Sequence, residues 1–422
     1  MRIAVVNNFF PPRTGGSAHL SDNLARSYAA NGHTVLVITA TYGQSPLRER
    51  RDGIDILRIP AWTLPRSRFA ANFDIGFTIS PKAKRRVFDA LDHFAPDVIH
   101  QHGQFFDLTW LSGWWARSRG VPTLLSIHTR LESPLSRFNS FIYAIADTVL
   151  VAPLMRVHRP ELVVMDIHMD RYIDKRYGRV IRGKTVIPVG VDPARMRGGN
   201  GENARAFLKS GDRPLILSLG HVIPQRNRLA LVRAMPAVLS KHPDALVAVV
   251  GGLYHQDFLA LAEQLGVRES IAAVGAVPQQ MIPDLLAAAD LEVHELEGQG
   301  FGTASLEALG AGTPVVAAVR PDNFIDIALV DGRDLFIAPF VSTGDERADP
   351  AGLAAAIVAV LDDPAAARRR VGENGRAIVD SHFSLERIAS KHMEVLSALI
   401  DASPPAPRRS PRGPIRTRMS RP

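Results

Sequence analysis

A glycine-rich segment between a predicted strand and a predicted helix is the strongest candidate for chemistry in this sequence. The run LEGQGFGTASLEALGAGTPVVAA covers residues 296–318, after a strand predicted over Leu291–Val293 and with a helix from about Thr303. Glycines let backbone amides approach an anion, and free N–H groups at a helix start attract negative charge. Glu307 follows one turn later and can accept hydrogen bonds from two vicinal hydroxyls. The segment therefore predicts a site for a diphosphate beside a pair of hydroxyls.

A second glycine pair, Gly15 and Gly16, follows the first predicted strand at residues 2–7. Glycines at this place permit positive φ and expose amides at a helix N-terminus, which suits an anionic group. The spacing differs from the dinucleotide pattern G-x-G-x-x-G, so a nicotinamide site gains little support. A plain tight turn is the structural alternative for this pair.

These segments resemble the signature of the retaining glycosyltransferases of family 4, which have the GT-B fold and an E-x7-E pattern around G-F-G. The resemblance covers nearly the whole chain and extends to DVIHQHG at 97–103, SIHTR at 126–130 and VIPVGVD at 186–192. It implies a metal-independent transfer of a sugar from a nucleotide diphosphate sugar to an acceptor hydroxyl, with no further cofactor. Closure of two domains around the donor would exclude water.

The resemblance also implies roles for individual residues. Glu307 would hold the nucleotide ribose, and His128, at the end of a strand predicted over Pro122–His128, would contact the donor sugar. A capped strand-end histidine is the structural alternative for His128. The residues that would face the donor sugar through the G-F-G backbone are Gly300, Phe301, Gly302 and Thr303. Gly16 would add its amide at the diphosphate.

The first glutamate of the family pattern is replaced here by Gln299. Glutamine can still exchange hydrogen bonds with sugar hydroxyls, but it has no charge to stabilise an oxocarbenium-like centre. Glu295 and Glu297 lie nearby and are out of register with the motif. This position, together with His128, is the candidate for orienting the sugar.

The diphosphate clamp also departs from the family pattern G-R-x4-K. The sequence has Gly220, His221 and, five residues later, Arg226. Arginine for lysine keeps a permanent cation and adds bidentate geometry, whereas histidine for arginine makes the second cation depend on pH. Arg228 or Arg233 is a candidate to compensate for that loss.

Two other functions stay open on the same residues. A GT-B nucleotide-sugar epimerase would use a similar diphosphate site and convert donor without any acceptor. A donor-binding paralogue with weak or no catalysis is motivated by Gln299 and His221. The sequence does not identify the nucleotide base, the sugar or the acceptor, which could be a glycan, a glycolipid or a secondary metabolite.

Histidine pairs suggest a metal site only weakly. His100 and His102 form an H-x-H at a predicted strand end, and His168 lies between two aspartates. The chain has no cysteine, and no third ligand lies in sequence near His100 and His102, so a structural interpretation is favoured for that pair; the same interpretation is favoured for His168.

Short apolar strands alternate with helical patterns along most of the chain, which is typical of an α/β fold with parallel sheets. We expect two Rossmann-like domains facing a central cleft: residues 1–185 for the acceptor and 186–400 for the donor. Residues 401–422 should form a disordered basic tail. The predicted strands lie at 2–7, 34–39, 54–59, 97–101, 122–128, 214–219, 245–250, 271–274, 291–293 and 314–318; the predicted helices lie at about 20–30, 229–239, 258–265, 281–288, 305–311, 353–361 and 385–400.

Composition supports a globular enzyme and limits the cellular compartments in which we expect it. The chain has 422 residues, 46% of them hydrophobic and 22% charged, and lacks cysteine, which excludes disulfides and thiolate metal sites. The best apolar run, Phe141–Met155, is broken by Asp147, and Met1 leads directly into a strand pattern without a signal-peptide cleavage region. We expect a cytoplasmic protein, and arginine usage of 43 against 7 lysines is typical of a GC-rich bacterium.

The formal charge of +8 comes from 50 basic and 42 acidic residues, and the tail alone carries six arginines against one aspartate. The rest is close to neutral, and nucleic-acid recognition motifs are missing. The stretch Trp62–Arg86 interleaves aromatic and basic side chains. A solvated basic helix face is one interpretation; the sharper one is peripheral docking onto an anionic membrane at its inner face.

Overall fold

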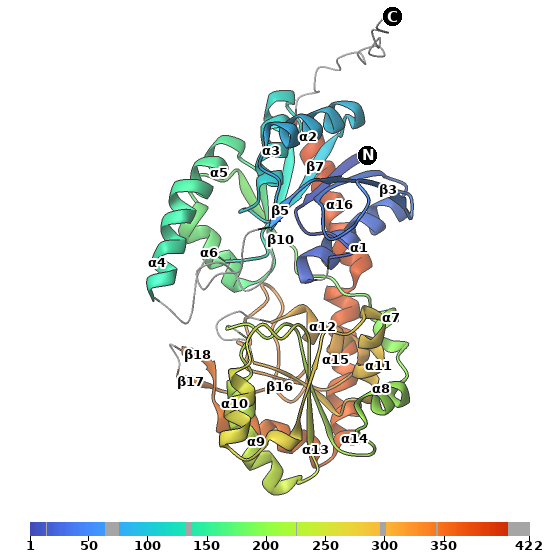
Figure 1. The fold of residues 1–422 in the computed structure, drawn as a ribbon, viewed down its shortest axis with the longest axis vertical. Helices are drawn as coiled ribbons and strands as arrows, with labels where there is room; N and C mark the ends of the chain where they lie inside the picture. Colours follow the sequence, from blue (N-terminus) through green and yellow to red (C-terminus); the bar gives the residue numbers. More distant parts are fainter. Residues whose placement is uncertain are drawn as a thin grey trace, which may run out of the picture.

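The computed structural model describes residues 1–13, 15–63, 76–130, 137–224, 226–295, 301–342 and 345–403. These residues form two α/β halves stacked along the long axis of the molecule (Figure 1). Each half contains its own largely parallel β-sheet. The predicted α/β class with two Rossmann-like sheets is therefore confirmed.

The first half is an eight-stranded sheet with the order β10-β9-β8-β7-β1-β2-β4-β3. Strand β3 pairs antiparallel with β4 at the edge, and the other neighbours pair in parallel. The strands are β1 (Arg2–Asn7), β2 (Thr34–Ala40), β3 (Arg48–Arg51), β4 (Ile54–Ile59), β7 (Val98–His102), β8 (Thr123–Ser126), β9 (Glu161–Val164) and β10 (Gly183–Val186); β5 (Trp62–Thr63) and β6 (Gly76–Phe77) form a separate antiparallel ribbon.

Helices cover both faces of this sheet, which explains why strands such as β1 and β2 are apolar on both faces. In β1, Ile3 and Val5 pack into one core, while Ala4 and Val6 pack into the core on the opposite face. The helices of this half are α1 (Gly16–Ala30), α2 (Pro81–Phe94), α3 (Asp107–Arg119), α4 (Arg137–Ala146), α5 (Ala152–His158) and α6 (Ile167–Tyr177), with a π-helical turn over Asp147–Val151 between α4 and α5.

The second half is a six-stranded parallel sheet with the order β13-β12-β11-β14-β15-β16. Its strands are β11 (Leu215–Leu219), β12 (Leu246–Val250), β13 (Ile271–Gly275), β14 (Leu291–His294), β15 (Val315–Ala317) and β16 (Phe336–Ile337), and β17 (Phe340–Ser342) pairs with β18 (Asp345–Ala348). Its helices are α7 (Pro193–Arg197), α8 (Gly201–Leu208), α9 (Leu229–Lys241), α10 (Asp257–Gln264), α11 (Ile282–Ala288), α12 (Thr303–Ala311), α13 (Pro350–Leu361), α14 (Pro364–Ala367) and α15 (Glu373–Ile378).

Every strand and helix predicted from the sequence is present within a few residues of its expected bounds. The elements missed by the sequence interpretation include β9, β10, α2, α3 and α6. Strand β10 has the sequence GKTV and is half-buried along its length, so no apolar run marks it. Such edge strands depend on pairing with a neighbour, here the parallel ladder with β9.

The last helix, α16 (Leu385–Asp401), crosses back to the first half, so the expected unit 186–400 needs correction at its end. Its residues Ile388, Leu396 and Leu399 are buried in the same core as β1 and α1. The long red helix in Figure 1 runs from the lower half into the upper one. The amphipathic pattern predicts a helix here but does not specify which core it covers.

Two chain segments cross side by side at the joint between the halves. The Val191 N–H donates to the Phe383 carbonyl at 2.9 Å, and the Leu385 N–H donates to the Val191 carbonyl at 2.7 Å. The first crossing is the linker that the sequence places at 186–192. Residues 404–422, most of the expected basic tail, lie outside the described residues.

Within the described chain, one helix is long and apolar enough to cross a membrane by length and composition, Ser140–His158 with 19 residues. The bent pair Pro350–Leu361 and Pro364–Phe383 passes the same test when taken as one span. Asp147 interrupts the apolar run Phe141–Met155 in sequence, but the helix itself continues through Asp147 in a π-helical turn.

Candidate functional site

The N-terminus of α1 is an open backbone turn. Gly15 has φ of 139°, a conformation that favours glycine, and the helix starts at Gly16 with no side-chain cap. A Cβ at Gly15 or Gly16 would meet no atom within 4 Å. The first amides of the helix therefore lack a side-chain cap, and the glycines leave open space beside the backbone there.

His221 follows β11 and is held by the backbone of the next βα turn. The Gly252 N–H donates to His221 Nδ1 at 3.0 Å, so the imidazole hydrogen lies on Nε2. Burial, with help from Arg226 and Arg228, lowers the pKa of His221 below its usual value. The sequence predicted a pH-conditional cation here; near neutrality His221 is instead a neutral donor through Nε2–H.

Arg226 presents a half-buried guanidinium for which no hydrogen bond or ion pair is seen among the described residues. Burial, followed by the charge of Arg228, lowers its pKa to about 10. Burying a charged guanidinium without a carboxylate partner costs desolvation free energy. Arg226 is therefore suited to bind an anion that arrives from solution.

Arg228 has a structural role rather than the compensating one suggested by the sequence. It is 3% exposed, and its guanidinium donates to the carbonyls of Leu219, Gly220 and Arg226 at 3.3, 3.0 and 3.1 Å. It thus holds the loop between β11 and α9 in place. Arg233 is exposed on α9, so it is the weaker of the two candidates for the clamp.

Electrostatic interactions connect these groups across the two halves. His19, one turn into α1, helps to lower the pKa of His221, and Arg195 on α7 helps to lower the pKa of His19. Arg195 also counteracts the raised pKa of Glu307. The start of α1, the clamp and the ribose candidate therefore surround one electropositive region at the carboxyl ends of β1, β11 and β14.

The glycine-rich turn is described from Phe301 onward. The Gly302 N–H donates to His294 Nε2 at 3.2 Å, and Gly302 caps α12 without a side-chain hydrogen bond. Phe301 is 7% exposed and packs its ring against Phe324, so only its backbone can face a ligand. Gln299 and Gly300 lie outside the described residues, and their roles stay predictions.

Glu307 is half-buried on α12, one turn after Thr303, and no hydrogen bond or ion pair of its carboxylate is seen within the described chain. Burial raises its pKa to about 7. A carboxylate without a partner beside uncapped helix amides is free to accept hydrogen bonds from a ligand's hydroxyls.

Two buried acids beneath this region were missed by sequence reasoning. Glu292 on β14 is fully buried and accepts a hydrogen bond from Ser305 Oγ at 2.9 Å; burial raises its pKa to about 8. Glu295 accepts the Leu231 N–H at 2.7 Å and so caps α9. The sequence signal was the pair of glutamates in LEVHE, in a strand that is otherwise apolar.

His128 belongs to a chain of histidines rather than to the cationic region. Its Nε2 is hydrogen-bonded to His102 Nδ1 at 2.9 Å, and the two rings stack. His100 lies beside His102 and is hydrogen-bonded to Tyr28 and Ser126, while His392 of α16 packs against His100. Burial lowers the pKa of His128 to about 4, so its ring is neutral and offers Nδ1 to a ligand.

Comparison with known proteins agrees with this arrangement. Residues 15–159 match the family model "Glycosyl transferase 4-like domain", and residues 200–378 match "Glycosyl transferases group 1". D-inositol 3-phosphate glycosyltransferase 2 of Catenulispora acidiphila is 30% identical over 333 residues, 72% of this chain and 71% of that protein. The chain is a family 4-type glycosyltransferase of the GT-B fold.

Two further similarities concern this glycosyltransferase. Alpha-monoglucosyldiacylglycerol synthase of Streptococcus pneumoniae is 25% identical over 336 residues, 76% of this chain and 72% of that protein. The solved structure of HepE from Anabaena in complex with UDP and glucose has a TM-score of 0.67 at 18% identity, covering 94% of this chain and 100% of that one. The second similarity shows the fold alone.

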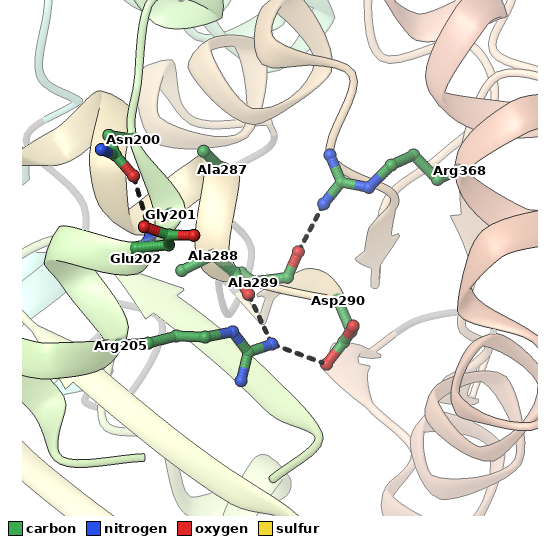
Figure 2. Close-up of a pocket in the computed structure, with 9 residues that line it drawn as sticks. All are labelled: Asn200, Gly201, Glu202, Arg205, Ala287, Ala288, Ala289, Asp290 and Arg368. Atoms are coloured by element: carbon green, nitrogen blue, oxygen red, sulfur yellow. Dashed lines mark hydrogen bonds and ion pairs between the residues drawn. The ribbon is translucent and has the colours of Figure 1, made fainter. Parts of the chain in front are cut away.

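A polar pocket of about 550 Å³ in this glycosyltransferase lies away from the donor candidates. Figure 2 shows Arg205 and Arg368 pointing at the carbonyls of Ala288 and Ala289, with hydrogen bonds of 3.0 and 2.6 Å. These carbonyls end α11 and precede β14, at the opposite end of that strand from the glycine-rich turn. The two arginines therefore cap a helix C-terminus.

The histidines flagged as weak metal candidates have other partners. His100 and His102 are buried in the histidine chain, and His168 lies on α6 near Arg130, Arg171 and Arg320, which together with burial bring its pKa to about 4. Among the described residues, no group of three histidine, aspartate or glutamate side chains is arranged to hold a metal ion.

Proposed function

We propose that this glycosyltransferase moves a sugar from a nucleotide diphosphate sugar to an acceptor hydroxyl with retention of the anomeric configuration. The observation that carries the proposal is the half-buried Arg226 guanidinium, which has no anionic partner among the described residues and adjoins the Nε2–H donor of His221. Such a pair can bind the diphosphate and stabilise its charge as it departs.

The remaining donor contacts follow from the same geometry. The Gly16 amide at α1 and the amides of the first turn of α12 from Thr303 supply uncapped N–H groups for phosphate oxygens, while Gly302, whose N–H is engaged by His294, lines the same turn with its backbone. The unpartnered Glu307 carboxylate accepts hydrogen bonds from the ribose hydroxyls. Gln299 and the backbone of Gly300 and Phe301 complete the sugar side of the site.

The chemical step uses front-face substitution. The bond from the anomeric carbon to the phosphate oxygen breaks, the bond to the acceptor oxygen forms on the same face, and the acceptor proton passes to the departing phosphate oxygen. His128 orients the sugar through Nδ1, since its Nε2 is engaged by His102. We propose that Arg226 and His221 fulfil the electrostatic task without a metal ion.

The comparisons suggest which ligands to test first. HepE was solved with UDP and glucose, which supports UDP as the first nucleotide and UDP-glucose as the first donor to test. The name of one relative gives a monoglucosyldiacylglycerol as its product and the name of the other gives an inositol phosphate, which supports a diacylglycerol-type lipid or a phosphorylated polyol as the acceptor class to test here.

Isothermal titration with UDP, GDP and ADP tests the donor site. Arg226→Ala should weaken binding of the preferred nucleotide by about tenfold or more, because a charge-assisted contact to the diphosphate is lost. Lys241→Ala removes an exposed cation at the C-terminal end of α9, far along the helix from the clamp, and should leave binding unchanged. Equal affinity of the Arg226 variant and the wild type would refute the clamp assignment.

A turnover assay uses the nucleotide sugar that contains the best-binding nucleotide. It distinguishes sugar transfer from epimerisation of the donor and from donor binding without catalysis. We expect product only when an acceptor is present, with the α-configuration of an α-linked donor retained. Conversion of donor alone would indicate an epimerase, and binding without turnover across acceptors would indicate a donor-binding paralogue. Either outcome would overturn the proposed reaction and leave the Arg226 result standing.

A further inference from the structure

The helix formed by α4, the π-helical turn and α5 has its apolar side facing outward. Its exposed side chains include Phe138 at 66%, Phe141 at 63% and Val149 at 62%. The exposed apolar residues recur at the spacing of one helix face: Phe138, Phe141, Ile142, Ile145, Val149 and Leu150. In Figure 1 this helix forms the outer left edge of the upper half.

The acidic residue of this helix points inward instead. Asp147 is 1% exposed and accepts hydrogen bonds from the hydroxyls of Tyr172, at 2.6 Å, and Tyr177, while Arg176 lies 3.8 Å away. A surface helix of a globular protein normally has the reverse arrangement. The hydrogen bonds of Asp147 thus hold the helix against the domain and leave its apolar face outward.

Packing against the domain means that the helix lies along the surface rather than spanning a bilayer. Val151 and Met155 on its inner side are buried in a core with Tyr172 and Ile173 of α6. Only 17% of the 18-residue apolar window is buried inside the protein. A stripe about 30 Å long, from 20 residues of helix, is therefore uncovered.

Basic side chains adjoin the C-terminal end of this stripe. Arg156 is exposed in the last turn of α5, followed by Arg159. Trp114 on α3 is 45% exposed, lies 6.2 Å from the His158 ring, and has Lys84 Nζ 5.8 Å from its own ring. From Lys84 the basic surface continues over α2, where Lys82, Arg85 and Arg86 are exposed.

We propose that this surface, residues 138–157 with Trp114 and the basic residues of α2, docks the enzyme on an anionic lipid membrane. An apolar stripe held parallel to the surface, an amphipathic tryptophan at its end and adjoining lysine and arginine side chains fit the boundary between acyl chains and anionic headgroups. The exposed side chains of the helix from Phe138 to Val157 include no acidic residue. Charge complementarity thus selects an anionic bilayer as the occupant.

The docking surface also lies close to the proposed reaction site along the chain. Helix α4 begins nine residues after His128, which limits their separation to about 30 Å. An acceptor carried by the membrane would meet the enzyme near the sugar-orienting histidine. The sequence placed membrane docking over Trp62–Arg86; of that stretch, residues 64–75 lie outside the described residues, and the α2 end now joins a larger surface.

Vesicle flotation of the full chain tests the proposal. The wild type should float with vesicles of phosphatidylcholine and phosphatidylglycerol, and less with phosphatidylcholine alone or at high salt. The double variant Phe141→Glu, Val149→Glu should partition on the order of tenfold less, since charged side chains replace the inserted ones. Phe207→Glu changes a side chain of the other half that is 48% exposed, and should float like the wild type.

UDP binding and size-exclusion chromatography complete the experiment. The double variant should keep the nucleotide affinity of the wild type, which shows that it is folded and separates this result from the donor proposal. Flotation of the double variant equal to wild type, or no vesicle binding by the wild type, would overturn the proposal. So would a wild-type dimer that the double variant abolishes, because the stripe would then be covered by a second copy.

Discussion

The raised pKa of Glu307 leads to a quantitative prediction about donor binding. Burial brings this pKa to about 7, and Arg195 is the neighbouring charge that partly counteracts it. Only the ionised carboxylate accepts hydrogen bonds with full charge from both ribose hydroxyls. The ionised fraction of a group with this pKa rises from roughly one tenth near pH 6 to roughly nine tenths near pH 8. Nucleotide affinity should therefore gain about tenfold over this interval, or about 1.4 kcal/mol.

Glu307→Gln removes this ionisation while keeping the size of the side chain. Isothermal titration with UDP, or with the nucleotide found to bind best, gives dissociation constants for both proteins across the interval. The ligand's own terminal phosphate titrates near about pH 6, so the informative quantity is the ratio of the two constants at each pH. The dissociation constant of Glu307→Gln divided by that of the wild type should rise about tenfold from the acidic to the alkaline end of the interval.

Two nearby groups are controlled in the same experiment. Burial, with help from Arg226 and Arg228, lowers the pKa of His221, and protonation of His221 towards the acidic end would strengthen binding, the opposite sign to the Glu307 effect. Glu292→Gln removes a second carboxyl with a pKa of about 8 that is bonded to Ser305; because burial and, to a smaller extent, the charge of Glu307 raise that pKa, this variant should keep a wild-type-like rise of affinity with pH but shift its midpoint. A constant ratio for Glu307→Gln, with binding intact, would refute the assignment of Glu307 to the ribose.

Three further predictions concern stability and positioning. Because folding raises the pKa of Glu292 from 4.5 to about 8, its unfolding releases a proton between these values and stability falls as pH rises; Glu292→Gln should recover about 2–4 kcal/mol at pH 8 and much less at pH 5 in urea titrations, and equal effects at both would contradict this. His102→Ala removes the partner of His128 Nε2 and should lower kcat about tenfold or more with unchanged UDP affinity; a change in affinity alone would argue against a positioning role. Leu396→Ala in α16 should cost about 2–5 kcal/mol by urea unfolding, because Leu396 is fully buried in the core of the first half, whereas Val395→Ala beside it should cost less.

Local patterns allowed much of the fold and part of the site to be predicted. Buried parallel strands are apolar on both faces, so β1, β2, β11 and β12 appear as continuous apolar runs that differ from their helical neighbours. The glycine-rich turn before α12, with Glu307 one turn later, also depends on residues adjacent in sequence. Such features could be predicted because their physical causes, backbone freedom and periodic burial, lie within one segment.

Long-range contacts decided the remaining features. The tautomer of His221 depends on the Gly252 amide, and the burial of Arg228 depends on carbonyls at the end of β11. The pairing of His102 with His128 requires β7 and β8 to lie side by side. None of these partners is marked by residue type or spacing, so the hydrogen bonding of the proposed clamp and of His128 could not be derived before the chain was folded.

The sequence by itself indicated an α/β glycosyltransferase and marked a candidate diphosphate-binding turn, because the strands, glycines and motif glutamate are local signals. Only the tertiary structure decided which faces meet and which stay exposed. An apolar helix such as residues 138–157 has the same hydropathy whether it is buried or exposed. Asp147 points inward because the hydroxyls of Tyr172 and Tyr177 donate hydrogen bonds to its carboxylate there. For the same reason the covering of the first sheet by α16 became known only from the folded chain.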